Sequence, residues 1–299
     1  MATGIVQAIV DRQKWLDELA DRIQPLVNQA FSSGGEAGHV IKDFLNGVWL
    51  GHPLHPVITD VPIGAWTMTE LLDLLSAAGG DDPALDRAAD LTLGAGIVAA
   101  VGAAVTGITD WSDVGGSHRR LGLLHGLLNA AGLGMNIASL GLRLGGNPRS
   151  RGLARGLSAG GYITTALAAY VAGELVYNLG MAINRNAWVS KPERFTDVAS
   201  VDELPEGRMV RFEVDGQPVV LVKHPDGIHA FSGTCSHYGC GLWEGQLNDH
   251  VVTCPCHGSQ FDVRDGRVVH GPATAPVPAY EVRTRNGRVQ VRLEQALRA

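Results

Sequence analysis

Three long stretches without Asp, Glu, Lys or Arg limit what this chain can fold into. They cover residues 91–109, 121–142 and 156–173. The hydrocarbon core of a bilayer is roughly 30 Å thick, and an α-helix crosses it with about 20 apolar residues. Each stretch therefore has about the length and composition of a membrane-spanning helix.

A fourth stretch, 57–79, is a weaker candidate because Asp60, Glu70 and Asp73 interrupt it. The alternative is a soluble bundle of helices rich in Gly and Ala. However, helices of soluble proteins seldom run so far without a polar face. Charged residues also make up only 18% of the chain, against about 25% in ordinary soluble domains. We predict an all-α bundle of four transmembrane helices within residues 41–185.

Small residues recur every four positions in two of the stretches. They are Ala95, Ala99 and Ala103 in one stretch and Gly122, Gly126, Ala130, Gly134 and Ala138 in the other. Small side chains at this spacing let membrane helices approach closely. We therefore expect a tightly packed bundle.

The N-terminal segment, residues 1–40, has a different pattern. Its apolar residues lie at roughly helical spacing among charged ones, and they are Ile5, Ile9, Leu16, Leu19, Ile23 and Leu26. This pattern predicts an amphipathic helix over 5–31 that lies on a surface rather than crossing a membrane. The turn SSGGEAG at 32–38 ends it. The helix is too charged for the core of a signal peptide, so we expect no cleaved export signal.

Ionisable residues gather at one end of the predicted bundle. If the chain crosses four times, the starts of the first and third helices and the end of the second share a face with the C-terminal region. The residues at these positions are His52, His55, Asp110, His118 and His125. The opposite loops, 79–90 and 145–155, contain no histidine. This asymmetry indicates a functional face.

His125 lies near one end of an apolar stretch, where an ionisable side chain is usually functional. It could ligate a b-type haem together with His55, since haem iron takes axial imidazoles. It could instead bind a quinone headgroup beside Asp60 or Asp110, accepting a hydrogen bond or a proton. The third interpretation is structural: His125 bonds to a neighbouring helix, and the motif that begins at His52 caps a helix. The residues leave all three open.

The segment LNGVWLGHPLHPVITDVPIGAW at 45–66 is followed by TGITDW at 106–111. Together they resemble an uncharacterised family of small bacterial four-span membrane proteins that carry an HPLHP-type motif. The resemblance covers about 40–185. It implies a topology rather than an activity.

After a linker at 186–196 the pattern changes to short alternating segments. MVRFEV, PVVLVK and IHAF are separated by DGQ and HPDG. Such segments predict hairpins, and VDG and RNG are good tight-turn sequences. We predict a multi-domain chain whose second domain, 197–299, is all-β and antiparallel.

Two loops of this domain carry metal-ligand residues. CSHYGCGLW offers Cys235 and His237, CPCHGSQF offers Cys254 and His257, and sixteen residues separate the two pairs. All four cysteines of the chain lie in this short region, which indicates a local metal site rather than a disulfide scaffold. Zinc also accepts two thiolates and two imidazoles, but zinc ribbons usually carry like ligands on each knuckle. The mixed loops match a Rieske 2Fe-2S cluster.

Through these loops, residues of about 195–293 resemble the Rieske proteins. The resemblance implies that Cys235 and Cys254 bind the buried iron. It also implies that His237 and His257 bind the outer iron, with the far edges of their rings near solvent.

Other positions extend the same resemblance. Cys240 and Cys256 occupy positions that form a disulfide in the high-potential Rieske proteins of cytochrome bc complexes, whereas Rieske ferredoxins that serve oxygenases generally lack that pair. Ser259 matches a hydroxyl that hydrogen-bonds a cluster sulfide and raises the potential. Phe261 stands where a tyrosine is frequent, so we expect a potential somewhat below that of the bc proteins. GPATAPVP at 271–278 resembles the proline loop that covers the cluster.

Two function classes follow. The first is a membrane-bound electron-transfer protein or oxidoreductase subunit, in which quinol or a membrane haem exchanges electrons with the cluster. The second is a membrane-tethered Rieske ferredoxin that donates electrons to a soluble oxidoreductase, with the helices only as an anchor. The shared face of the histidines and the cluster favours the first.

Other classes fit poorly. Only 21 residues follow Pro278, so we do not expect a self-contained Rieske oxygenase, which needs a further iron domain. The net charge is -6, and no dense run of Lys and Arg occurs, which argues against nucleic acid as a partner.

Charge does not fix the side of the membrane. Six Lys or Arg residues lie near the helices on the histidine-bearing face and five on the opposite face, so the positive-inside rule does not decide. The expected lack of an export signal favours the cytoplasm, and a stable disulfide favours the outside. We predict a multi-pass protein of the cell membrane with its C-terminal domain on the cytoplasmic face.

Overall fold

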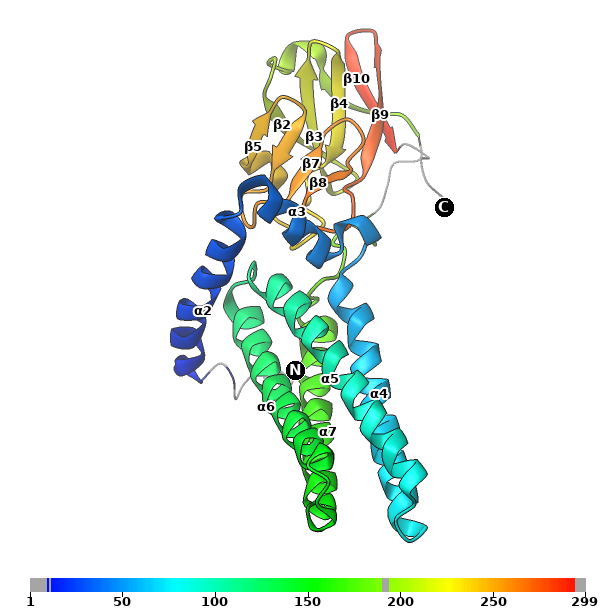
Figure 1. Ribbon diagram of the computed structural model, residues 1–299. Coiled ribbons are helices and arrows are strands. Elements are labelled where there is room, and N and C mark those ends of the chain that lie inside the picture. The colour runs from blue at the N-terminus through cyan, green and yellow to red at the C-terminus, as the bar shows by residue number, and fades with distance from the viewer. Residues whose placement is uncertain (1–9, 11, 190–193, 294–299) are drawn as a thin grey trace. The chain divides into compact units, whose positions relative to one another are not determined.

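The computed structural model describes residues 10, 12–189 and 194–293. The chain divides into two compact units (Figure 1). The helical unit consists of residues 1–38 and 54–181, and the β unit of residues 39–53 and 182–299. Each unit is described by itself.

Helices occupy most of the N-terminal half. They are α2 (Lys14–Ser32), α3 (Gly35–Asn46), α4 (Leu54–Ala78), α5 (Pro83–Trp111), α6 (Gly116–Leu144) and α7 (Arg151–Gly173), with short 3-10 turns at Val48–Leu50 and Pro148–Ser150 and a π-helical turn at Glu174–Asn178. The helical N-terminal region is therefore confirmed. Helix α3 was not expected, because the predicted turn at 32–38 is in fact only a short break between α2 and α3.

The start of α5 shows why this helix begins where it does. The Asp82 side chain accepts a hydrogen bond from the backbone N–H of Ala84 at 2.8 Å, and Pro83 occupies the first turn, where its missing N–H costs nothing.

Helices α5 and α6, each 29 residues long, are long and apolar enough to cross a membrane. Among the described residues, α4 and α7 do not meet the same measure of length and hydropathy.

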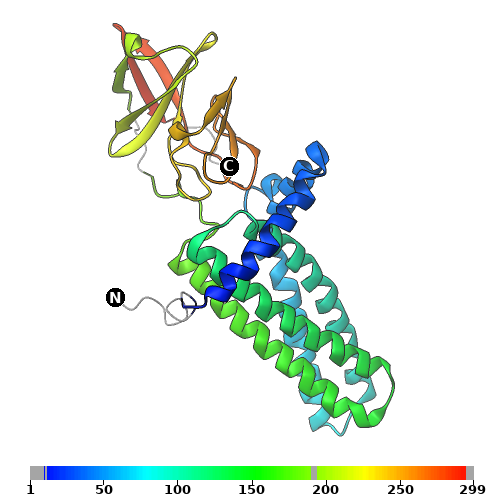
Figure 2. The same cartoon turned by 90° about the vertical axis from the view of Figure 1, so that its left-hand side faces the viewer.

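Helices α4 to α7 run side by side as a bundle, the cyan and green ribbons of Figure 2. Helices α6 and α7 approach most closely at two glycines. A Cβ atom on Gly132 would lie 2.9 Å from the carbonyl oxygen of Gly161, so no larger residue fits there. By contrast, Gly126 and Gly134 have no neighbour within 4 Å. The expectation that their stripe packs tightly is wrong at these two positions.

Buried charges join the helices at the end of the bundle that carries the loops 79–82 and 145–150. Arg143 of α6 has a fully buried side chain and donates to Asp73 of α4 at 3.0 Å and to Asp90 of α5 at 3.1 Å. Arg151 of α7 also donates to Asp90, at 2.8 Å. Asp73, which interrupts an apolar stretch, is therefore paired rather than isolated.

Helix α2 lies along the bundle with one face inward, the dark blue helix of Figure 2. Leu16 is buried, and Arg120 of α6 donates to Asp17 at 2.9 Å. Gln24 donates to the carbonyl oxygen of Trp111 at 2.9 Å, at the end of α5. The amphipathic helix is present, while Ile5 and Ile9 lie outside the described residues.

The β unit contains two antiparallel sheets. The six-stranded sheet has the order β1-β10-β9-β4-β3-β2, and the four-stranded sheet has the order β5-β6-β7-β8. The strands of the larger sheet are β1 (Thr196–Ser200), β2 (Met209–Val214), β3 (Gln217–His224), β4 (Gly227–Ser232), β9 (Ala279–Arg285) and β10 (Arg288–Leu293). Those of the smaller sheet are β5 (Gln246–Asn248), β6 (Val251–Thr253), β7 (Gln260–Asp262) and β8 (Val268–His270).

Hairpin turns and a doubly buried strand fix this arrangement. The predicted tight turn at VDG is present: Asp215 and Gly216 between β2 and β3 have φ values of 51° and 75°, as a type I′ turn requires. Strand β3 is buried on both faces, since Val219 and Leu221 join one core cluster and Val220 joins the other. The second cluster also contains the cysteines of the predicted metal site, so the core of the β unit supports that site directly.

The C-terminal part of α3 belongs to the β unit. Its Asp43 accepts a hydrogen bond from the backbone N–H of Gly271 at 2.8 Å and lies 2.7 Å from Nδ1 of His270. The sequence did not predict this contact, because the helix and the loop are more than two hundred residues apart.

Candidate metal centre and buried histidines

Two loops with the same backbone pattern form the predicted metal centre. In the first, the N–H of Cys235 donates to the carbonyl of Cys240 at 2.9 Å, and the N–H of Gly239 donates to the carbonyl of Cys235 at 2.9 Å. In the second, the N–H of Cys254 donates to the carbonyl of Ser259 at 2.8 Å, and the N–H of Gly258 to the carbonyl of Cys254 at 3.1 Å. Gly239 and Gly258 both have φ of 78°, a conformation that favours glycine.

The loops bring the four predicted ligands together in two pairs. Cys235 and Cys254 are buried, with exposures of 1% and 2%. His237 and His257 are only partly buried, and their ring centroids lie 5.1 Å apart at an angle of 88°. Two buried thiols beside two outer imidazoles are the donor set that a Rieske cluster requires.

Backbone N–H groups favour a negative charge on both sulfurs. The N–H groups of His237 and Tyr238 point to the Cys235 sulfur, and those of Cys256 and His257 point to the Cys254 sulfur. The hydrogen bond between the two thiols raises the pKa of Cys235 and lowers the pKa of Cys254 to about 6. Thiolates held by N–H donors suit the cysteine side of an iron-sulfur cluster.

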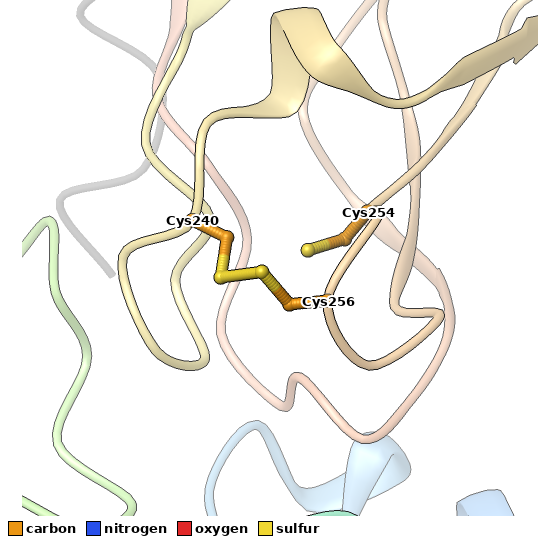
Figure 3. Close-up of side chains that lie close together, drawn as sticks. All are labelled: Cys240, Cys254 and Cys256. Carbon is orange, nitrogen blue, oxygen red and sulfur yellow. A yellow bond between two sulfur atoms is a disulfide. The ribbon is translucent and has the colours of Figure 1, made fainter.

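A disulfide joins the loops, as predicted. Cys240 and Cys256 are bonded to each other, and in Figure 3 the Cys254 side chain points toward the bridge. The three sulfur atoms lie within 4.8 Å of one another. The bridge therefore constrains the two loops immediately beside the predicted ligands.

The segment 271–278 is tied to both loops. Ser259 is fully buried, and its hydroxyl oxygen accepts a hydrogen bond from the N–H of Ala273 at 3.0 Å. The hydroxyl of Ser236 donates to the carbonyl of Ala275 at 2.6 Å. Sequence reasoning singled out Ser259 but missed Ser236, although its place next to Cys235 was a usable signal.

Residues of the predicted linker support the first loop. The Asn186 side chain is buried, donates to the carbonyl of Thr234 at 2.8 Å and accepts from the Ser232 hydroxyl at 2.8 Å. The backbone N–H of Arg185, the residue just before the predicted linker, donates to the carbonyl of Ser236 at 3.1 Å. These side chains were not predicted as part of the site, because nothing in their local pattern distinguishes them from a polar linker.

In the helical unit, two of the predicted histidines meet. The rings of His55 and His125 have centroids 6.2 Å apart at an angle of 89°. Nδ1 of His55 lies 2.9 Å from the carbonyl oxygen of Ala103, and Nδ1 of His125 lies 2.9 Å from that of Ala168. A Cβ atom on Gly107 would lie 2.8 Å from the His55 ring, so this glycine makes room for the imidazole.

Three other residues were predicted for the same site: His52, Asp60 and Asp110. His52 belongs to the β unit and is exposed, with Nδ1 3.2 Å from the carbonyl oxygen of Pro53. Asp60 is exposed on α4, and Asp110 is partly buried near the end of α5. Nε2 of His125 lies 3.1 Å from Nδ2 of Asn129, a contact that the sequence analysis did not consider.

Comparison with known proteins gives the class of protein. The model of the Rieske [2Fe-2S] domain matches residues 194–281, and that of the predicted membrane protein family DUF2231 matches residues 51–185. The chain belongs to the Rieske 2Fe-2S electron-transfer proteins. More particularly, it joins such a domain to a DUF2231 membrane domain.

Relatives of two kinds are similar to this chain. The "Cytochrome b6-f complex iron-sulfur subunit" of Chlorobaculum tepidum is 28% identical over 169 residues, which are 55% of this chain and 92% of that protein. The "Alkene monooxygenase system, ferredoxin component" of Xanthobacter autotrophicus is 37% identical over 101 residues, which are 33% of this chain and 82% of that protein. The ferredoxin component of the naphthalene 1,2-dioxygenase/salicylate 5-hydroxylase systems of a Ralstonia species is 30% identical, covering 34% of this chain and 98% of that protein.

Proposed function

We propose that this protein is a membrane-bound electron carrier that takes electrons from a quinol. Cys235 and Cys254 would bind the inner iron, and His237 and His257 the outer iron. The support is the burial of the two thiols and the partial exposure of the two imidazoles. When bound, the cluster supplies a one-electron redox centre.

The observation that carries the quinol proposal is the Cys240–Cys256 disulfide, in a chain that also has a membrane domain. A disulfide between the loops is a mark of the Rieske proteins that work with quinols, and a membrane domain keeps the protein where quinols are found. The rings of His237 and His257 are the partly exposed groups of the site. Either imidazole could accept a hydrogen bond from a quinol hydroxyl and hold the proton it gives up.

The helical unit would cross the membrane with four helices and hold a quinone headgroup at His55 and His125. Both rings direct Nδ1 toward backbone carbonyls, which favours the tautomer with Nε2 as an acceptor. Such an acceptor suits the hydroxyl of the reduced headgroup, the quinol. Because the helices alternate in direction, the chain enters α4 and leaves α7 at the end of the bundle that carries these histidines. Haem ligation by the same pair is the second candidate. Asn129 lies 3.1 Å from Nε2 of His125, so either ligand would have to displace this contact at His125.

The alternative function is a tethered ferredoxin for a soluble partner protein. Its specific support is the 37% identity with a ferredoxin component, which is higher than the 28% identity with the cytochrome b6-f subunit. In that case the helical unit serves only as an anchor.

Reduction by quinol separates the two functions. Full-length oxidised protein in lipid nanodiscs is mixed with decylubiquinol, and the reduced cluster is counted by EPR. We expect rapid reduction that a quinone-site inhibitor slows. A cluster that ignores quinol yet is reduced by NADH through a ferredoxin reductase would establish the alternative.

Matched variants test the buried histidines. We expect His55→Gln and His125→Gln to slow reduction by quinol at least about tenfold, while His118→Gln, whose ring bonds to the carbonyl of Leu179 instead, does not. A pyridine haemochrome assay on the same samples detects haem, and a positive result would replace quinone by haem at this pair.

A further inference from the structure

Three histidines and two aspartates cluster on the β unit, apart from the iron-sulfur loops. They are His224, Asp226, His229, Asp249 and His250, and we call them the three-histidine cluster. Two hairpin turns and one strand supply them. His224 and Asp226 flank the turn between β3 and β4, His229 lies on β4, and Asp249 and His250 form the turn between β5 and β6.

The imidazoles converge on one carboxylate. Nε2 of His229 lies 3.0 Å from Oδ1 of Asp226, and Nε2 of His250 lies 3.0 Å from Oδ2. Nδ1 of His224 lies 3.3 Å from Oδ1 of the same residue. In a tetrahedral zinc site with bonds of about 2.0 Å, neighbouring ligand atoms are about 3.3 Å apart. The two N···O distances of 3.0 Å are close to this spacing, and each of the two histidines approaches a different oxygen of Asp226.

Asp249 stands behind two of the imidazoles. Its Oδ1 lies 3.3 Å from Nε2 of His224, and its Oδ2 lies 3.1 Å from Nδ1 of His250. These are the opposite ring nitrogens from those that face Asp226. A carboxylate on the far nitrogen fixes the orientation of a metal-ligating histidine and increases its basicity. The cluster thus has both an inner set of ligands and an outer support.

Burial and charge agree with a cation site. The side chains of the three histidines are only 13% to 18% exposed, so the rings are held in place, while Asp226 and Asp249 are 48% and 74% exposed and face solvent. Nδ1 of His224 is buried, and its 3.3 Å approach to Asp226 does not form a hydrogen bond.

We propose that Asp226, His229 and His250, whose ligand atoms lie within 4.8 Å of one another, bind one divalent transition-metal ion, with Zn²⁺ as the best fit, and that Asp249 positions the rings of His250 and of the adjacent His224. Imidazole and carboxylate together form a donor set that binds Zn²⁺ or Cu²⁺ in preference to Ca²⁺ or Mg²⁺. The two carboxylates balance the charge of the ion. The bound metal would hold the β3–β4 turn against the β5–β6 turn, and β6 leads from His250 to the loop of Cys254.

Zinc binding to the whole protein tests the site. Full-length protein that retains its cluster, with any affinity tag removed, is washed with chelator and titrated with Zn²⁺ by calorimetry. We expect one Zn²⁺ per chain beyond the two irons. His250→Gln and His229→Gln should weaken binding more than about a hundredfold, and Asp249→Asn about ten- to a hundredfold.

His39→Gln is the matched control, because this exposed histidine of the β unit lies outside the cluster and should leave Zn²⁺ affinity unchanged. Cu²⁺ gives a second readout, since an oxidised 2Fe-2S cluster is diamagnetic and the copper EPR signal should carry hyperfine lines from imidazole nitrogens. If His250→Gln loses the iron-sulfur cluster, the Zn²⁺ affinities of His229→Gln and Asp249→Asn decide whether the site exists. If Zn²⁺ does not bind one-to-one, or if these variants bind it as tightly as the control does, the proposal is wrong. The cluster is then only a set of ion pairs.

Discussion

At the scale of single residues, hydrogen bonds order the buried side chains beside the predicted cluster ligands. Ser259 uses its oxygen to accept the N–H of Ala273, so its O–H proton can be donated to a cluster sulfide. A donor to a sulfide stabilises the reduced cluster, which carries more negative charge. Ser236 makes the comparable bond to segment 271–278 but donates its proton to a backbone carbonyl.

We expect Ser259→Ala to lower the reduction potential of the cluster. A hydrogen bond to a charged group contributes about 1.5 kcal/mol, which corresponds to about 60 mV for a one-electron couple. A redox titration followed by EPR measures the shift. Ser236→Ala, which loses only a bond to the loop, should change the potential much less, and equal shifts in the two variants would contradict a direct bond to the cluster.

Asp262 on β7 gives a pH prediction. Its side chain is 2% exposed and lies 2.6 Å from Arg264 and 2.8 Å from Arg267. The hydrogen bond from Arg264 lowers the pKa of Asp262 to about 2. Because the folded pKa is below the unfolded value, this stabilisation is present above about pH 4 and is lost as the pH falls toward 2.

Asp262→Asn should therefore reduce the free energy of unfolding by about 2 kcal/mol at pH 7 and flatten its dependence on pH between 4 and 2. Urea unfolding at several pH values, followed by fluorescence, checks this. Asp265→Asn is the control, since that carboxylate is 53% exposed. The same pH dependence in the wild type and Asp262→Asn would refute the assignment.

At the scale of elements, ion pairs hold the helices of the bundle together. Arg143 of α6 is fully buried and bonds to Asp73 of α4 and Asp90 of α5. A buried pair adds little net stability, but removing one partner leaves an uncompensated charge. The ring of His55 at the start of α4 fills the space beside Gly107 of α5.

Asp73→Asn should destabilise the helical unit by at most about 3–5 kcal/mol, because the Arg143 guanidinium loses its buried partner and keeps only Asp90, which is 25% exposed. Thermal unfolding in detergent measures the loss. Asp81→Asn breaks a pair whose carboxylate is 70% exposed and should cost less than about 1 kcal/mol. The double change Asp73→Leu with Arg143→Met should recover most of the stability, and a failure to recover would assign the loss to packing instead.

At the scale of the whole molecule, the chain passes three times between its two units, at residues 38–39, 53–54 and 181–182. Two helices are apolar enough to cross a membrane by themselves, whereas four crossings remain our proposal. The two topologies differ in one respect that labelling can detect. With four crossings, the loop between α6 and α7 lies on the opposite side from the β unit, and with two crossings it lies on the same side.

Single cysteines at Arg149 and Arg285 test this. Both positions are exposed, one in the α6–α7 loop and one on β9, and the native cysteines are buried or in a disulfide. We expect a membrane-impermeant maleimide to label Arg149→Cys in intact cells and Arg285→Cys only after permeabilisation. Labelling of both from one side would exclude four crossings, and the reversed pattern would put the β unit outside.

The sequence alone determined the class of each domain and the identity of the predicted cluster ligands. Charge-free stretches and the spacing of Cys235, His237, Cys254 and His257 are local patterns, which the chain carries whatever its tertiary packing. Only the tertiary structure decided that Asp43 contacts His270, that Asp73 meets Arg143 and that three histidines surround Asp226. These contacts join residues that are distant in the chain, and they depend on strand register and helix packing, which no local pattern encodes.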